Sequence, residues 1–343
     1  MRKLDLYIAF NFIAPFVIAT AFITGLYIVG DAFGKLDDYL EEAGAIGEAL
    51  SRMVRLYPLR IPAFVAPILP VGMLFGAAYG LAQLSGRNEL TAMRACGIGL
   101  WRILAPIYVT ATMIALLGMA NRELLVPKVE AATAGDVARW TGEAKKYKPV
   151  TLYLEREETL FTMRYNVERR HARSVSITRQ ATGEHIRALE ARPVAGGWEL
   201  TDATIGDQAF PRFTLKTSLR RHEVERALVD PALCPIGDLR NLIRADPANR
   251  AYRMLYHARL TYPFVGIVLV GLGLPFVIGR ERIQRSRLLG VGVCVLICMV
   301  FYTVEFIARD LGEAGYLPAA LAAWLPTVVF GALGFYLLDT LHS

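Results

Sequence analysis

Several patterns that would identify an enzyme are missing from this sequence of 343 residues. No stretch fits G-x-x-x-x-G-K-[ST], so the chain carries no P-loop of its own for ATP hydrolysis. Its five histidines are scattered, and neither a Ser-His-Asp constellation nor a metal-ligand cluster can be argued from their positions. We therefore expect no catalytic residue, no metal site and no cofactor.

Cysteine is scarce, and its positions exclude a disulfide framework. Cys234 is the only one of four cysteines in the middle of the chain. Cys294 and Cys298 stand four residues apart in an apolar run, where they share one helix face. Burial explains that spacing better than a disulfide, because helical geometry does not favour the bond.

The chain also lacks a basic stripe with interleaved aromatic residues, although its net charge is +7 and its pI is about 9.3. Its arginines cluster beside apolar runs instead. That placement indicates topology signalling and contact with anionic lipid headgroups. We therefore expect no nucleic-acid partner.

Apolar sequence is what the chain has in abundance. Hydrophobic residues make up 54% and the mean hydropathy is +0.37, with the excess in blocks at the two ends. About 20 helical residues cross the hydrocarbon core of a bilayer. Six charge-free runs approach or exceed this length: 6–30, 61–86, 103–121, 260–279, 288–304 and 314–338. The sequence thus predicts a membrane α-helical protein with six transmembrane helices, three on each side of an inserted domain.

Prolines mark the second run. They stand at Pro58, Pro62, Pro67 and Pro70. Because proline leaves a backbone carbonyl without its helical partner, we expect this helix to bend or to start late. Packed neighbours should then satisfy the free carbonyls.

Lysine and arginine set the orientation, because they are enriched in cytoplasmic loops. Such residues precede the first run and fill the loops after the second and fourth: Arg2, Lys3, Arg87, Arg94, Arg102, Arg280, Arg282, Arg285 and Arg287. All of these segments fall on one side of the membrane. Both termini are therefore predicted to be cytoplasmic, with residues 122–259 outside.

The inserted domain is expected to be β-rich. Phe161, Met163 and Tyr165 alternate with polar neighbours, as in a half-buried strand. A turn at Gly196-Gly197 precedes Trp198. Five to eight antiparallel strands fit an all-β, jelly-roll-like domain or an open sandwich sheet. The predicted boundaries are 1–122 for helices 1–3, 123–256 for the β domain with helical connectors, and 257–343 for helices 4–6.

A short cytoplasmic helix is predicted within residues 85–99, which we call the coupling segment. Asn88 can cap it, Glu89 suits the positive end of its dipole, and Gly97 can stop it. Leu90 and Met93 share one face. Two interpretations remain open: an amphipathic helix on the membrane surface, or a coupling helix that binds a cytoplasmic ATPase.

A family resemblance favours the second interpretation. The run from Asn88 to Gly97 resembles the ELT-x-M-x-A-x-G coupling segment of the lipopolysaccharide-export permeases, the LptF/LptG family. Further agreement comes from Leu4-Asp5-x-Tyr7-Ile8, Leu69-Pro70, Leu74-Phe75-Gly76, Pro127 and Leu325-Pro326. The likeness covers the whole chain in layout and residues 1–130 in motif detail. The opening motif leans toward LptG.

The resemblance implies a permease subunit in the inner membrane. Such subunits form a pair that is powered by a dimeric ABC ATPase, and they pass lipopolysaccharide to a periplasmic bridge protein through a periplasmic β domain. Glu89 and Arg94, with Leu90 and Met93, would then couple to the ATPase. The first and fifth transmembrane helices would form lateral gates for the lipid.

Basic residues between the first two apolar runs, on the outer side of the membrane, are candidates for binding the lipid's phosphates, since Lys and Arg pair with phosphate. They are Lys35, Arg52, Arg55 and Arg60. Snorkelling at the interface is the competing explanation for each. Asp31 stands where the family often has a base, which puts the identity of the cargo in question. Glu305, near the end of the fifth transmembrane helix, is predicted to pair with Arg309 at i,i+4.

Two other functions remain as alternatives. An ion-coupled secondary transporter would need ionisable groups near the membrane midplane, and the six runs carry almost none. A non-transporting envelope scaffold would use the β domain only as a tether. Cargo lipid bound between the helices would distinguish a transporter from such a scaffold.

Overall fold

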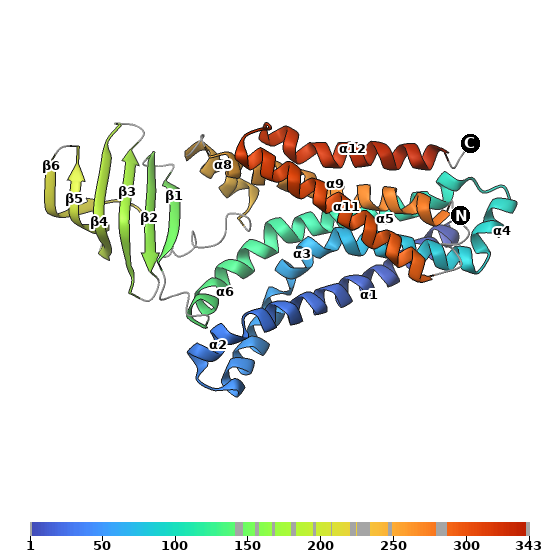
Figure 1. Ribbon diagram of the computed structural model, residues 1–343, viewed down its shortest axis with the longest axis horizontal. Coiled ribbons are helices and arrows are strands. Elements are labelled where there is room, and N and C mark those ends of the chain that lie inside the picture. Colours follow the sequence, from blue (N-terminus) through green and yellow to red (C-terminus); the bar gives the residue numbers. More distant parts are fainter. Residues whose placement is uncertain are drawn as a thin grey trace. The chain divides into compact units, whose positions relative to one another are not determined.

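Long helices precede and follow an inserted β-sheet in the sequence (Figure 1). The computed structural model describes residues 2–140, 147–154, 158–166, 169–179, 183–194, 197–206, 208–219, 224, 234–245, 249–278 and 287–340. The helices are α1 (Arg2–Gly34), α2 (Leu36–Ala43), α3 (Ile46–Gly86), α4 (Glu89–Ala95), α5 (Leu100–Ala120), α6 (Val126–Trp140), α8 (Ile236–Ala245), α9 (Arg250–Ile278), α11 (Arg287–Ala314) and α12 (Ala319–Thr340). A π-helical turn, Asn121–Leu125, joins α5 to α6.

Within the described residues, six helical spans are long and apolar enough to cross a membrane, as the sequence predicted. They are α1, α3, α9, α11, α12 and the continuous run from α5 into α6. Arg280, Arg282 and Arg285 of the predicted cytoplasmic loop, and Gly196 of the predicted turn, lie outside the described residues.

The chain divides into two units, each with its own internal packing. The first unit contains Met1–Ile28, Pro62–Arg122 and Arg253–Ser343, which hold most of the apolar helices. The second unit contains Val29–Ile61 and Glu123–Tyr252, with α2, α6, α8 and the sheet. The division falls inside α1 and α3, so a segment before the β domain in the sequence also belongs to the second unit.

The second transmembrane helix begins earlier than its prolines suggested. Helix α3 starts at Ile46 and continues through all four prolines to Gly86. Pro70 cannot donate to the carbonyl of Ala66, and the hydroxyl of Tyr262 on α9 donates to that carbonyl over 2.6 Å instead. Of the two alternatives, the late start is wrong, whereas the expectation that a packed neighbour satisfies a freed carbonyl is confirmed at Ala66.

The core of the first unit lies where α1, α3, α5 and α9 meet. Phe12, Leu74, Ile103 and Leu269 are each at most 1% exposed and belong to one cluster. Burial is uneven among the helices, since 72% of the most apolar window of α9 is buried but only 17% in α1 and in α11. Much of the apolar surface of α1 and α11 is therefore left uncovered by the described residues.

The β-sheet of the second unit has six antiparallel strands in the order of the sequence. They are β1 (Lys148–Leu154), β2 (Thr159–Asn166), β3 (His171–Arg179), β4 (His185–Val194), β5 (Gly197–Ile205) and β6 (Gln208–Lys216). The expected class, membrane helices with an inserted antiparallel β domain, is confirmed. Its strand order is a meander in which β1 and β6 are the edges, which is simpler than the exchange of strands in a jelly roll.

Alternation along the strands explains the core of the sheet. Phe161, Met163 and Tyr165 are buried, and Trp198 packs edge-on against Tyr165. The indole of Trp198 donates to the carbonyl of Leu219 over 3.0 Å. A Cβ at Gly197 would lie 2.0 Å from the carbonyl oxygen of Leu215, so β5 and β6 pair closely there only because this residue is glycine.

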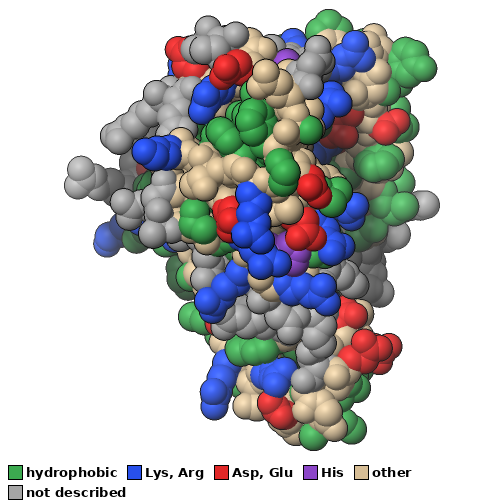
Figure 2. Space-filling view, turned by 90° about the vertical axis from the view of Figure 1, so that its left-hand side faces the viewer, with side chains coloured by type: hydrophobic (Ala, Val, Ile, Leu, Met, Phe, Trp, Pro, Cys, Tyr) green, Lys and Arg blue, Asp and Glu red, His purple; other side chains and the backbone are tan. Residues whose placement is uncertain are grey.

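Charge on the outer surface of the molecule is mixed. Figure 2 shows lysine and arginine side chains interspersed with aspartate and glutamate. Exposed bases on the strands include Arg164, Arg187 and Arg192. Such a polar surface suits contact with water, unlike the apolar faces of α1 and α11.

Candidate functional site

The coupling segment forms one short helix, α4, between two turns. Asn88 precedes it with a φ of 60° and makes no side-chain cap, so its predicted capping role is wrong. Asn88 instead supplies the left-handed turn that ends α3, and its amide donates to the carbonyl of Ser85 over 2.9 Å. Asparagine adopts this conformation more readily than most residues, because its short polar side chain bonds locally.

The end of α4 follows the prediction for Gly97. This glycine has a φ of 80°, and its amide donates to the carbonyl of Arg94 over 3.0 Å. The amide of Ile98 reaches back to Met93 over 3.1 Å. These two bonds form a Schellman motif, which fixes the direction in which the chain leaves the helix.

Helix α4 has an inner and an outer face. Leu90 is 4% exposed within the core of the first unit, and Met93 packs against the same cluster. The outer face presents Thr91, Ala92, Arg94 and Ala95 to the surroundings. Leu90 and Met93 therefore hold the helix in place, and Arg94 lies on the face that a partner could reach.

Glu89 is tied to the beginning of α1. The hydroxyl of Tyr7 donates to the Oε2 atom of Glu89 over 2.7 Å, and the guanidinium of Arg87 lies 3.9 Å from Oε1. Beyond the other end of the coupling segment, Arg102 forms an ion pair of 2.8 Å with Asp5. Sequence reasoning missed both contacts, because their partners lie 82 and 97 residues apart and no local pattern marks them.

Helix α1 packs against α3 along a line of glycines that we call the glycine seam. It consists of Gly72, Gly76 and Gly80 on α3. Added Cβ atoms would lie 2.1 Å from the hydroxyl of Thr20 at the first, 2.8 Å from the Cα of Phe16 at the second and 2.3 Å from the carbonyl of Asn11 at the third. The spacing of four residues is a signal for close helix packing in membranes that sequence reasoning could have used.

An apolar cavity of about 350 Å³ lies between α1, α3 and α11. Its lining includes Phe22, Phe75, Tyr79 and Cys294. Gln83 is a polar exception among the lining side chains. The cavity suits a hydrocarbon chain better than a charged group, because an unpaired charge there would lose its hydration.

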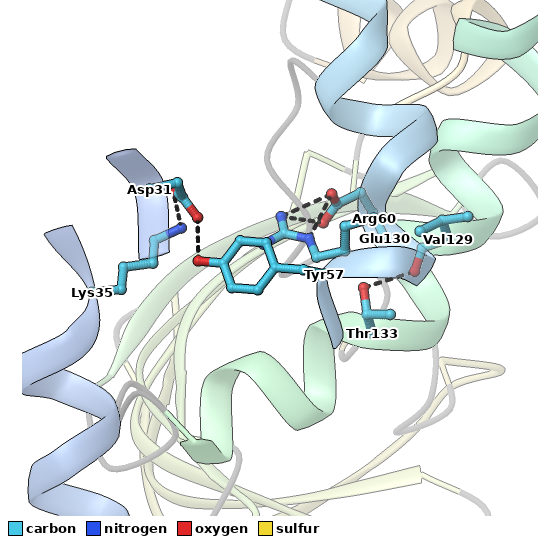
Figure 3. A network of polar contacts seen from close by, with 7 residues as sticks. All are labelled: Asp31, Lys35, Tyr57, Arg60, Val129, Glu130 and Thr133. Carbon is cyan, nitrogen blue, oxygen red and sulfur yellow. Dashed lines mark hydrogen bonds and ion pairs between the residues drawn. The ribbon is translucent and has the colours of Figure 1, made fainter. Parts of the chain in front are cut away.

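Polar residues of the second unit join α1, α3 and α6 in what we call the polar network (Figure 3). Asp31 of α1 accepts bonds of 2.8 Å from Lys35 and from the hydroxyl of Tyr57 on α3. One turn further along α3, Arg60 binds both carboxylate oxygens of Glu130 on α6, at 2.8 and 3.1 Å. Glu130 is only 6% exposed, so loss of Arg60 would leave a buried carboxylate without this partner.

The four basic residues proposed to contact lipid differ in their surroundings. Lys35, Arg52 and Arg60 are ion-paired with Asp31, Glu48 and Glu130. Arg55 is exposed, and no ion pair of this residue occurs within the described part of the chain. Sequence reasoning found the bases but missed the acids that pair with them. Asp31 and Glu48 are four residues from Lys35 and Arg52, a local signal that could have been used, whereas Glu130 is distant from Arg60 in sequence.

Arg309 was predicted to pair with Glu305, but its hydrogen bond in the structure is with another glutamate. The guanidinium of Arg309 donates to Glu313 over 3.0 Å, so the partner lies one turn after Arg309. Among the described residues, no group of three or more histidines, cysteines, aspartates or glutamates could hold a metal ion.

The comparison with protein families decides the identity of this architecture. The model of the lipopolysaccharide export system permease LptF/LptG matches residues 6–340. The chain belongs to the LptF/LptG family. It is therefore a multi-pass protein of the inner membrane and a permease subunit of the lipopolysaccharide export system. A search of curated proteins gave no match.

The coupling segment and the polar network are two separate candidate sites of this LptF/LptG permease. The match spans both units, so the six apolar helices and the β-sheet are parts of one permease. The coupling segment lies in the first unit and the polar network in the second. Their chemistry is also different: α4 offers a small exposed face, whereas the network offers ionised groups.

Proposed function

We propose that this permease is a non-catalytic subunit of an ABC transporter, which takes lipopolysaccharide or a related glycolipid from the inner membrane. A separate ATPase dimer binds the coupling segment through Glu89 and Arg94. Both termini and α4 are cytoplasmic, and the β domain is periplasmic, where it passes lipid to a bridge protein. The observation that carries this proposal is the geometry of α4, a short helix held by two buried side chains with its other face exposed.

The exposed apolar surfaces support a paired assembly. The most apolar windows of α1 and α11 are 17% buried, although other spans of the same chain reach 72%. A second permease subunit, together with the lipid, would cover these surfaces. Exposed arginines on the strands, Arg164, Arg187 and Arg192, support placement of the β domain in the periplasm.

The ion pairs of the outer basic residues indicate which of them could bind the phosphates of the lipid. Arg55 is exposed and is the first candidate for contact. Lys35 could exchange Asp31 for a phosphate, because its side chain is 36% exposed. Arg60 is a poor candidate, since leaving Glu130 would strand a buried carboxylate. Arg52 pairs within its own helix and can be released at little cost.

Replacing Glu89 with arginine tests the coupling role. We expect Glu89→Arg to abolish copurification of the ATPase and to stop lipid release, because the reversed charge would meet the ATPase surface that the carboxylate binds. Asp310→Arg on α11 makes the same change at an exposed position and should leave both measurements unchanged. Normal copurification and transport by Glu89→Arg would refute the coupling role.

A further inference from the structure

The beginning of α1 contacts both ends of the coupling segment. Figure 1 shows the N-terminus at the same end of the helices as α4. Tyr7 binds Glu89 at the start of α4, and Asp5 binds Arg102 just after the segment ends. Ile8 and Leu90 are buried in the same apolar cluster between these polar contacts. A shift of the coupling segment would therefore act directly on residues 5–8.

The glycine seam extends this connection along α1. The contacts along the seam run in opposite directions on the two helices. From the start of α1 onward, Asn11 meets Gly80, Phe16 meets Gly76 and Thr20 meets Gly72. The two helices are therefore antiparallel and closely packed. Helix α3 ends at Gly86, and α4 begins at Glu89. Because helices packed this closely cannot slide past each other without clashes, α1 and α3 should move together.

Between its two ends, little of α1 is buried by the described residues. Only 17% of its most apolar window is buried, and Phe10 and Val17 are exposed. Besides the seam, polar contacts hold α1 at its start and, through Asp31 and Tyr57, near its end. In a chain of rigid elements, such contacts decide which neighbour a helix follows.

We propose that Tyr7 and Asp5 are positioning residues that make α1 follow the coupling segment. Displacement of α4 by the ATPase then becomes movement of α1, without any contact between α1 and the ATPase. This inference rests on the proposed coupling function and adds the path by which the movement spreads. Tyr7 fixes the carboxylate of Glu89, and Asp5 fixes the start of α5 through Arg102.

The ion pair allows a test by charge exchange in the complete transporter complex, reconstituted in liposomes. The variants are Asp5→Arg, Arg102→Asp and the combination of both, with Tyr7→Phe as an independent probe of the hydroxyl. Lipid released per ATP hydrolysed is the readout, together with copurification of the ATPase and thermal stability. Both side chains of the pair are more than a third exposed, so the single changes should leave stability nearly unchanged.

We expect each single variant to retain the ATPase while releasing about fivefold less lipid per ATP hydrolysed. A factor of about five is at the lower end of the coupling factors typical between two sites of a protein. The combined exchange should restore the ratio, because it rebuilds the pair with reversed charges. Glu313→Arg, which breaks an ion pair within α11, and Tyr336→Phe, at an exposed tyrosine, are matched controls that should not alter the ratio.

Three results would overturn the inference. Single variants could keep the original ratio, or the combined exchange could release as little lipid as the single changes. Loss of the ATPase from Asp5→Arg would show that these contacts serve binding and not transmission. Failure of the proposed function is distinguishable, because the ATPase would then copurify equally with Glu89→Arg and with the unaltered chain.

Discussion

At the scale of single residues, the polar network shows how a positive charge can serve the fold instead of the cargo. Arg60 and Glu130 have side chains that are 15% and 7% exposed, and they join α3 to α6. Arg52 and Glu48 are 21% and 54% exposed, and they lie on one helix. The same ion-pair chemistry therefore has different consequences at the two positions.

Removing Arg60 should destabilise the protein far more than removing Arg52. Arg60→Ala leaves the buried Glu130 carboxylate unpaired, which costs about 3–5 kcal/mol, whereas an exposed pair within one helix contributes about 0.5 kcal/mol or less. Thermal unfolding of the purified permease in detergent measures the difference. The double variant Arg60→Ala/Glu130→Ala should recover part of the loss. Equal unfolding temperatures for Arg60→Ala and Arg52→Ala would contradict a structural role for this pair.

Residue contacts were also the least predictable part of the site. The charges of Glu89, Arg94 and the four outer bases could be identified from the sequence, since each stands in a local pattern. The partners of Glu89 and Arg60 could not be identified, because Tyr7 and Glu130 come near them only through helix packing. The partners of Lys35 and Arg52 stand four residues away, where spacing alone could have indicated them. For Arg309, local spacing allowed a partner at i−4 or i+4, and the packing selected Glu313.

At the scale of elements, α1 and α3 form the closest helix contact that the glycines define. The seam brings the backbone of one helix against the other at Asn11 and Gly80. Sequence analysis placed both spans and expected packed neighbours to satisfy the carbonyls that the prolines of α3 leave free. It could not identify Tyr262, far along the chain, as the neighbour that binds the carbonyl of Ala66.

Alanine at Gly80 should loosen this contact. Its Cβ would lie 2.3 Å from the carbonyl oxygen of Asn11, so the helices must separate, at a cost of about 1–3 kcal/mol. Gly25→Ala on α1 is the matched control, since its Cβ would meet nothing within 4 Å and alanine favours helices by up to about 1 kcal/mol. We expect a lower unfolding temperature only for Gly80→Ala. A similar decrease for both variants would rule out the seam as the cause.

At the scale of the whole molecule, the division into membrane helices and an inserted β domain could be predicted because hydrophobic runs and strand alternation are local patterns. The segment Val29–Ile61 could not be assigned in the same way. It belongs with the β domain's unit, although it precedes that domain by more than 60 residues. Its membership depends on contacts such as that between Arg60 and Glu130, which bring α3 and α6 together.

The proposed orientation can be tested with the chain's own cysteine. Cys96 is exposed in the coupling segment, so a variant with Cys234→Ser, Cys294→Ala and Cys298→Ala retains one reactive thiol. A membrane-impermeant maleimide should label it in opened cells but not in intact spheroplasts. Adding Arg187→Cys, at an exposed position of β4, should allow labelling from outside. Labelling of Cys96 in intact spheroplasts would reverse the proposed orientation.

The meander leaves two outer strands, and each contains a proline: Pro149 in β1 and Pro211 in β6. Proline has no amide hydrogen, so an added strand would lose a rung of its ladder at that position. This protects the sheet against uncontrolled aggregation through its margins. A strand that another protein adds beside β6 must therefore pair mainly with the residues after Pro211. This limits both the length and the register of the added strand.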